Sequence, residues 1–271
     1  MRTVALGGVR LAYEERGAGD PVVLVHLAVF ADGFAPLMDQ PALGRYRLIR
    51  YHRRGYGSSS HTRRPVTVVD QAADLAGLLD YLGVRRAHIV GHSFGGLVTL
   101  QFAAEHPDLV GSLVLMEAAL RVRAAGPASQ EMTRRMVHGF QRYREGDREG
   151  GLHDAMAAVI QNYRQEDVDH LLPGAWTQAV RDVDTFFGND FLGVQSWEFG
   201  DADARHITAP MLWVMSGEHH PAFGEMEQLL RAWFPQLETA RVPGVNHLLH
   251  MQQPSPVAER LAGFFAQHPL F

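Results

Sequence analysis

The chain has 271 residues, of which 46% are hydrophobic and 20% are charged, and its formal net charge is -5. This length and composition fit one large α/β domain with room for an inserted subdomain, and they exclude a disordered or fibrous protein. The mild acidity excludes the basic surface that a nucleic-acid-binding protein needs, and the absence of cysteine excludes disulfides and thiolate metal sites.

Targeting and membrane signals are missing from the sequence. The first residues lack the apolar stretch of a signal peptide, and no window approaches the ~20 apolar residues of a membrane span. We therefore expect a soluble cytoplasmic protein. The densest basic stretch is interrupted by tyrosines and glycines, so we expect most of it to be solvated surface. It contains Arg45, Arg47, Arg50, Arg53 and Arg54, and we interpret the pair Arg63-Arg64 in the same way.

The chain opens with strand patterns. Two short runs at residues 3–6 and 9–14 flank the pair Gly7-Gly8 and predict a hairpin. The continuous apolar run at 21–26 is typical of a strand buried on both faces of a parallel sheet. Similar runs recur at 47–51, 87–90, 112–116, 211–215 and, in a shorter form, 239–242.

Helical patterns separate these strands. The best defined helix is predicted at 68–82, where Thr67 and Asp70 form a capping box and Gly83 follows the last turn. Strands that alternate with helices of this length predict an α/β fold with a doubly wound, mostly parallel sheet.

The alternation breaks at residues 118–204, which carry helical periodicity and no convincing strand. We interpret this stretch as a helical cap inserted between two sheet strands. The core of the protein would then comprise residues 1–117 and 205–271. Most aromatic residues of the insertion should form the cap's own core, and a minority would line a substrate pocket.

The segment 91–95 reads Gly-His-Ser-Phe-Gly between a strand pattern and a helix pattern. A serine at such a sharp turn is held in a strained conformation that exposes its hydroxyl, and glycines are needed on both sides for lack of space. The following helix presents its N-terminus, with the amide of Phe94, to developing negative charge. The sequence therefore predicts Ser93 as a catalytic nucleophile.

With these motifs the chain resembles the α/β-hydrolase superfamily along nearly its whole length. Residues 22–26 are similar to the family's oxyanion strand, and residues 91–96 to its nucleophile elbow. The sequence Arg-Arg-Gly-Tyr-Gly-Ser-Ser at 53–59 resembles its Arg-Gly-x-Gly-x-Ser loop. The insertion at 118–204 falls where the family places its cap, and residues 242–247 resemble the loop of the catalytic histidine.

The resemblance implies the remaining parts of the site. His247 would be the general base, with His250 as its nearest rival. The oxyanion hole would use the backbone N–H groups of Phe94 and Ala28. Leucine replaces the family's usual glycine at position 27, and we expect its larger side chain to narrow the acyl pocket. We assign Leu27, which precedes the oxyanion donor Ala28, and His92, which precedes Ser93, to substrate binding.

The triad acid departs from the family pattern. His220 stands where relatives carry an aspartate after the strand that follows the cap, and a histidine cannot supply the negative charge that orients the base. Glu117, at the end of the strand before the cap, occupies the position that some relatives use. We favour Glu117, keep Glu218 as the alternative acid, and leave open a site with no defined acid.

The sequence predicts a serine hydrolase that cleaves a carboxylic ester, lactone or thioester of a small molecule. A serine nucleophile argues against epoxide opening and dehalogenation, for which relatives use aspartate. A second hypothesis is a carbon–carbon bond lyase or natural-product cyclase that uses His247 as its base. A third is a ligand-binding receptor with slow turnover. We expect no metal and no cofactor, and the sequence carries no signal for the oligomeric state.

Overall fold

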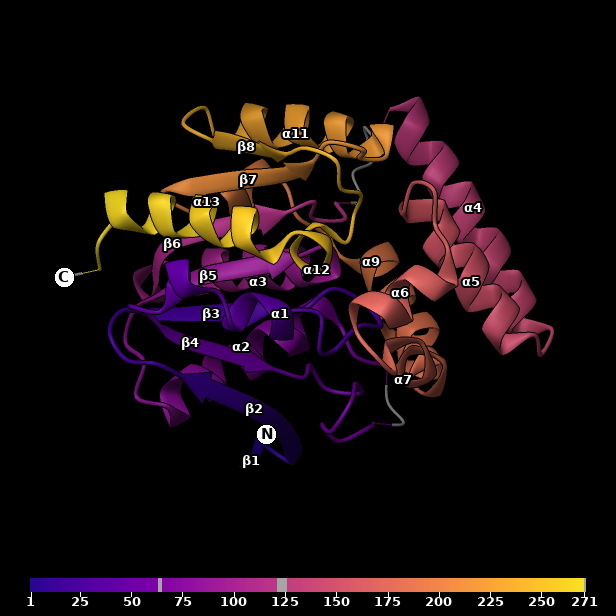
Figure 1. Cartoon of the computed structure of the whole chain (residues 1–271), viewed down its shortest axis with the longest axis horizontal. Coiled ribbons are helices and arrows are strands. Elements are labelled where there is room, and N and C mark those ends of the chain that lie inside the picture. The colour runs from indigo at the N-terminus through magenta and orange to yellow at the C-terminus, as the bar shows by residue number, and fades with distance from the viewer. Residues whose placement is uncertain (63–64, 121–125, 271) are drawn as a thin grey trace.

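The computed structural model describes residues 1–62, 65–120 and 126–270. Within them, eight strands form a single sheet (Figure 1). The strands are β1 (Arg2–Leu6), β2 (Val9–Arg16), β3 (Pro21–Val25), β4 (Arg47–Tyr51), β5 (Ala87–His92), β6 (Val110–Met116), β7 (Met211–Ser216) and β8 (Glu238–Val242). Their order across the sheet is β1-β2-β4-β3-β5-β6-β7-β8.

The strand pairing confirms the predicted fold class. β1 pairs with β2 and β2 with β4 in antiparallel register, while the other neighbours run parallel. The order reverses around β3, since β4 lies on one side of it and β5 on the other. The carboxyl ends of the parallel strands therefore lie along one edge, where α/β sheets bind their ligands.

Helices cover both faces of this sheet. On one face lie α2 (Val68–Tyr81), α3 (Phe94–Glu105) and α11 (Pro221–Trp233), which share an apolar core with the strands. On the other face lie α1 (Ala35–Met38), α12 (Leu249–Gln252) and α13 (Pro254–Gln267), with a second apolar core (Figure 1). Two 3-10 turns, η1 (Pro41–Leu43) and η2 (Pro107–Leu109), complete the connections.

Helix α2 begins as its sequence predicts. The Thr67 hydroxyl accepts the Asp70 N–H at 3.0 Å, and the Asp70 carboxylate accepts the Thr67 N–H at 2.8 Å. This reciprocal capping satisfies two of the backbone donors that a helix start leaves free. Gly83, one residue beyond the C-cap, has a φ of 65°, which explains the glycine there.

The described part of the segment between β6 and β7 is helical. Its elements are α4 (Pro127–Arg144), α5 (Arg148–Val159), α6 (Gln165–Leu171), α7 (Ala175–Arg181), α8 (Val183–Thr185), the π-helix η3 (Phe186–Phe191), α9 (Leu192–Ser196) and α10 (Asp201–Ala204). Residues 121–125 of the predicted cap lie outside the described residues. Among the described residues, no helix combines the length and apolar character that crossing a bilayer requires.

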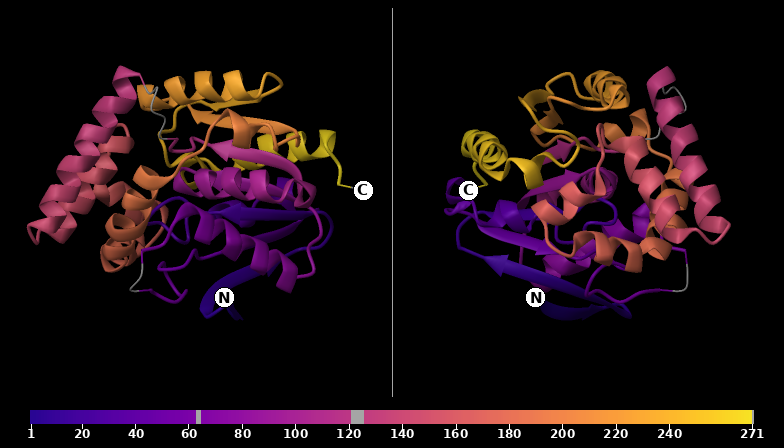
Figure 2. Two further views of the ribbon diagram at one scale, coloured as in Figure 1. Left: turned by 180° about the vertical axis from the view of Figure 1, so that it is seen from behind. Right: turned by 45° about the vertical axis from the view of Figure 1, so that its right-hand side comes forward.

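Figure 2 shows this helical layer beside the carboxyl ends of the parallel strands. Its apolar core includes Trp176 and Phe187, and it also takes in Leu27, Val29 and Leu248 from loops of the sheet domain. The cap therefore packs directly on the loop that follows β3, the loop in which the sequence places one oxyanion donor.

Candidate active site

Ser93 lies at the turn between β5 and α3. Its φ of 52° and ψ of -118° fall outside the regions that a non-glycine residue ordinarily occupies. The surrounding atoms leave room only for glycine on either side of this turn. A side chain at position 95 would collide with the Val25 carbonyl, and one at position 91 would collide with Thr99 and the Gly95 carbonyl. The strained backbone fixes Ser93 at the carboxyl edge of the sheet.

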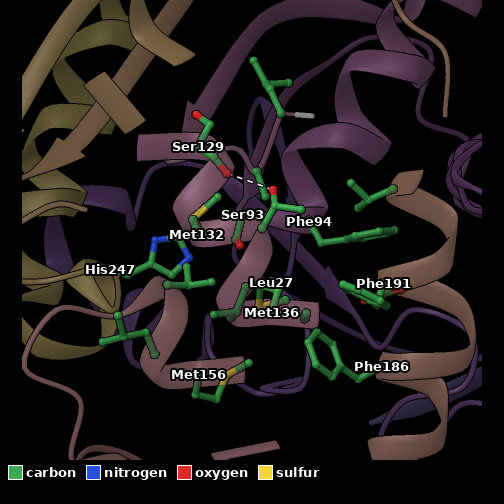
Figure 3. A pocket seen from close by; sticks show the side chains of 18 of the residues that line it. Leu27, Ser93, Phe94, Ser129, Met132, Met136, Met156, Phe186, Phe191 and His247 are labelled. Carbon is green, nitrogen blue, oxygen red and sulfur yellow. Dashed lines mark hydrogen bonds between the residues drawn. The ribbon is translucent and has the colours of Figure 1, made fainter. Parts of the chain in front are cut away.

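His247 follows β8, and its imidazole points toward Ser93 across the pocket (Figure 3). Its Nδ1 lies 2.6 Å from Oε2 of Glu117, and the ring is buried. A carboxylate can only accept a hydrogen bond, so Nδ1 carries the proton and Nε2 keeps its lone pair. Within the described residues this buried Nε2 has no hydrogen-bond partner. The geometry thus leaves one basic nitrogen available on the side of Ser93.

Glu117 follows the last residue of β6 and is fully buried. While Oε2 faces His247, Oε1 accepts the N–H of Ser216 at 2.7 Å and its hydroxyl at 2.5 Å. Burial raises the pKa of Glu117, but the hydrogen bonds from His247 and Ser216 outweigh burial and hold the pKa below its ordinary value. The residue is therefore a carboxylate at neutral pH.

The other candidate positions for the acid have different surroundings. The Glu218 side chain is exposed, in contrast to buried Glu117. His220, which stands where the family pattern carries an aspartate, is buried and caps α11, since its Nδ1 accepts the Ala222 N–H at 3.2 Å. Of the two predicted acids, the structure brings Glu117 to His247.

Ala28 and Phe94 both lie in the wall of the pocket with Ser93. Neither backbone N–H donates to another protein group in the described part of the chain. A tight γ-turn follows Ala28: the Phe30 N–H bonds the Ala28 carbonyl at 2.8 Å, and Val29 has a φ of 62°. Such a turn is rare and strained for a β-branched residue.

The expectation that most of the arginines are solvated surface is wrong for those at 45–54. Arg45 is exposed, Arg47 and Arg54 are half-buried, and Arg50 and Arg53 are buried, while residues 63–64 lie outside the described residues. The Arg53 guanidinium bonds the Asp190 carboxylate through two nitrogens, at 2.7 and 3.0 Å. Burial opposes the charge of Arg53, but Asp190 outweighs it and raises the pKa of the guanidinium. Sequence reasoning missed this pair, because nothing in the sequence of the cap marks Asp190 as the partner.

The pocket beside Ser93 holds about 990 Å³ of space, including its open mouth. Its wall is mostly apolar, with four methionines, and comes from both the sheet domain and the cap (Figure 3). The apolar lining residues include Leu27, Phe94, Leu120, Met132, Met136, Met156, Ile160, Phe186, Phe191 and Met226. The polar ones are Ser93, Ser129, Thr133, Asp190, Gln195 and His247.

Leu27 lies in this wall, as a substrate-binding residue would. His92 does not: it is fully buried, and its ring packs against His247, with the two ring centroids 4.7 Å apart. The interpretation of His92 as a residue that contacts substrate therefore has no support in the geometry. In the described residues, no three His, Cys, Asp or Glu side chains are placed to hold a metal ion.

His250 also packs against His92, at 4.6 Å between ring centroids, and is fully buried. Burial, together with the charge of His247, lowers its pKa to about 3. An unfolded chain protonates histidine near pH ~6.5. Between these two values the unfolded state binds a proton that the folded state does not, so the free energy of unfolding falls as the pH falls through this window.

Replacing His250 with phenylalanine should remove this pH-dependent loss. We expect the loss of unfolding free energy between pH 7 and pH 5 to be smaller in His250→Phe by about 2 kcal/mol, which urea unfolding at both pH values measures. His206→Gln is the control, because His206 is exposed. An unchanged pH dependence in His250→Phe would contradict the prediction.

Comparisons with known proteins agree with this architecture. Residues 20–254 match the family model described as alpha/beta hydrolase fold. The esterase of Thermogutta terrifontis has a similar structure, with a TM-score of 0.81 and 23% identity over 98% of this chain and 97% of its own. The enol-lactonase of Burkholderia xenovorans aligns with a TM-score of 0.80 and 19% identity, over 98% of this chain and 100% of its own.

Two curated relatives match part of the chain. A putative carbamate hydrolase of Azorhizobium caulinodans is 32% identical over 115 residues, which are 42% of this chain and 43% of the relative. A 2-hydroxy-6-oxo-2,4-heptadienoate hydrolase of Pseudomonas putida is 39% identical over 127 residues, 43% of this chain and 44% of the relative. The match thus spans less than half of each relative. The family match, by contrast, spans most of this chain, which therefore belongs to the family of proteins with the alpha/beta hydrolase fold.

Proposed function

We propose that this chain is a serine hydrolase that cleaves a carboxylic ester, lactone or thioester of a small molecule through an acyl-enzyme on Ser93. The hydrogen bond of 2.6 Å between Glu117 and His247 carries the proposal. It leaves Nε2 of His247, which has no hydrogen-bond partner among the described residues, on the side of Ser93 (Figure 3). This arrangement supports acyl transfer, in which an acid orients the base and the base takes the proton of the nucleophile.

In the proposed reaction, His247 Nε2 takes the proton of the Ser93 hydroxyl as its oxygen attacks the carbonyl carbon. The N–H groups of Phe94 and Ala28 stabilise the negative charge that develops on the carbonyl oxygen. The imidazolium, held by Glu117, then protonates the leaving alcohol or thiol. Water activated by the same imidazole hydrolyses the acyl-enzyme and restores Ser93.

The lining of the pocket supports an apolar substrate. Four methionines and several aromatic rings surround Ser93. Methionine side chains adapt their shape, so such a wall accepts apolar groups of varied outline. The names of the similar proteins agree with hydrolysis in general, since they include a carbamate hydrolase, a dienoate hydrolase, an esterase and an enol-lactonase.

Labelling with a phosphonate tests the nucleophile. An alkyl 4-nitrophenyl phosphonate should phosphonylate Ser93, and mass spectrometry of the digested chain should find the adduct on the peptide that contains it. Ser129 offers the matched control: it lies in the same pocket wall, but its hydroxyl donates to Glu225 at 2.6 Å. Ser129→Ala should be labelled like the wild type. An unlabelled wild type at high probe concentration would instead favour a ligand-binding receptor.

A further inference from the structure

The peptide group between Leu27 and Ala28 carries the Leu27 carbonyl on one side and the Ala28 N–H on the other. A trans peptide is planar, and the structure holds no cis peptide in its described residues, so fixing this carbonyl also fixes the direction of the N–H. Two side chains lie within hydrogen-bond distance of the Leu27 oxygen. They are His26, through Nδ1 at 2.6 Å, and Arg53, through Nη2 at 3.3 Å.

Both of these side chains are donors to the Leu27 oxygen. His26 Nε2 accepts the Arg53 backbone N–H at 2.9 Å, so the proton of the imidazole is on Nδ1. Burial, and then the charge of Arg53, keep the pKa of His26 well below its ordinary value, which leaves the ring neutral. Arg53 is therefore the charged donor at this peptide, and Nε of the same side chain also bonds the His26 carbonyl at 3.2 Å.

The cap holds Arg53 in this position. Asp190 lies on η3 and receives both terminal nitrogens of the guanidinium. The same carboxylate also accepts the Tyr56 hydroxyl at 2.7 Å and the Gln71 amide at 3.3 Å. Its oxygens are thus already bonded to groups of the protein, although Asp190 lines the pocket. Its geometry serves Arg53 rather than a substrate cation.

Arg53 also touches the second oxyanion donor. The centre of its guanidinium lies 4.7 Å from the centroid of the Phe94 ring, a cation–π distance. One buried side chain therefore contacts the residues on both sides of the proposed oxyanion hole. It bonds the carbonyl of the peptide that presents the Ala28 N–H, and it packs on the side chain of Phe94.

We propose that Arg53 is a positioning residue for the oxyanion hole and that Asp190 of the cap holds it there, an inference that rests on the proposed function. A cationic donor on the Leu27 carbonyl orients the Leu27–Ala28 peptide. By polarising this peptide it also makes the Ala28 N–H a stronger hydrogen-bond donor. Displacing a catalytic group by about 1 Å can slow catalysis by about 100-fold.

The double variant Arg53→Gln/Asp190→Asn tests this proposal, because it removes the charged donor without leaving a buried charge unpaired. We expect kcat for a neutral 4-nitrophenyl ester, and the rate of phosphonate labelling, to fall by about 10- to 100-fold. KM should change by less. The acid limb of the pH profile should stay in place, because the pair of Glu117 and His247 is not altered.

The neighbouring pair supplies the matched control. Arg54 bonds Asp74 of α2 through two nitrogens, away from the Leu27 carbonyl. Arg54→Gln/Asp74→Asn should therefore keep kcat and the labelling rate within about threefold of the wild type, although it too loses an ion pair. A loss of rate as large as that of the Arg53 double variant would mean that general loosening is the cause, and would overturn the proposal.

The thermal unfolding temperature of each variant shows whether a lost rate comes from a less stable protein or from a misplaced oxyanion donor. An Arg53→Gln/Asp190→Asn protein that is folded and turns over at the wild-type rate would overturn the proposal. If this variant does not fold, Arg53→Lys decides, since one ammonium replaces the three guanidinium nitrogens that together bond Asp190, Leu27 and His26. A lowered kcat in Arg53→Lys supports the proposal, and an unchanged kcat overturns it. A wild type that is neither labelled nor active on esters would remove the proposed function itself, and this inference with it.

Discussion

Replacing Ser93 with alanine should lower kcat/KM for a neutral 4-nitrophenyl ester by about 10⁴- to 10⁶-fold, because the proposed acyl-enzyme could no longer form. The remaining rate would come from the proposed oxyanion donors and from binding, which the substitution leaves in place. Steady-state assays measure the effect, and phosphonate titration of the wild type gives the concentration of active sites. Substrate affinity should change little, since Ser93 contributes one small group to a wide apolar wall.

The same variant separates the proposed function from its alternatives. A lyase or cyclase that uses His247 as its base would keep turnover of its own substrate in Ser93→Ala, because no covalent intermediate is needed. Ser129→Ala, the other serine substitution in the pocket wall, should retain ester hydrolysis. Ester turnover by Ser93→Ala within about tenfold of the wild type would rule out an acyl-enzyme on Ser93.

The parts of the site that could be predicted from sequence are those with a local physical signature. The turn at Ser93 needs glycines on either side and adjoins a strand and a helix, so five residues and their flanks identify it. The same holds for the capping box of Thr67 and Asp70, and for the apolar strands. In each case the interaction joins residues close in the chain, and their spacing alone limits what they can form.

Glu117 was predicted from the family resemblance, because some relatives carry their acid at the end of the strand before the cap. The sheet places β6 beside β5, so Glu117 lies at the same edge as Ser93, but β7 separates β6 from β8. The contact between Glu117 and His247, which are 130 residues apart, therefore depends on how the loop after β8 folds back, and strand order alone does not give it. Glu218 also follows a strand, but the chain there turns it outward, which no sequence pattern shows.

The partners of Arg53 could not be predicted. Asp190 is 137 residues away and lies on a cap helix whose packing depends on many weak apolar contacts. A charged residue in a polar stretch is typical of solvated surface, and the sequence does not show that Arg53 is covered by the cap. The surroundings of His92 were hidden for a related reason, because its neighbour Ser93 lines the pocket while His92 itself is fully buried against His247.

Replacing Glu117 with glutamine should lower kcat by about 10²- to 10⁴-fold while the fold is retained. Glutamine has the same shape, and its amide oxygen can accept the two hydrogen bonds that Ser216 donates to Oε1. The NH₂ group then faces His247 Nδ1, which must become an acceptor. The imidazole proton moves to Nε2, and a protonated Nε2 cannot take the proton of Ser93. The variant therefore loses both the negative charge and the tautomer that the base needs.

Glu218→Gln is the matched control, because it makes the same change in the rival candidate, on an exposed side chain. We expect its kcat to stay within about threefold of the wild type. Equal thermal stability of the two variants would show that the difference in rate is chemical. If Glu117→Gln kept its rate while Glu218→Gln lost it, the acid would be Glu218. If both kept their rates, Ser93 and His247 would act as a dyad. Glu117 would then have only a structural role at the end of β6.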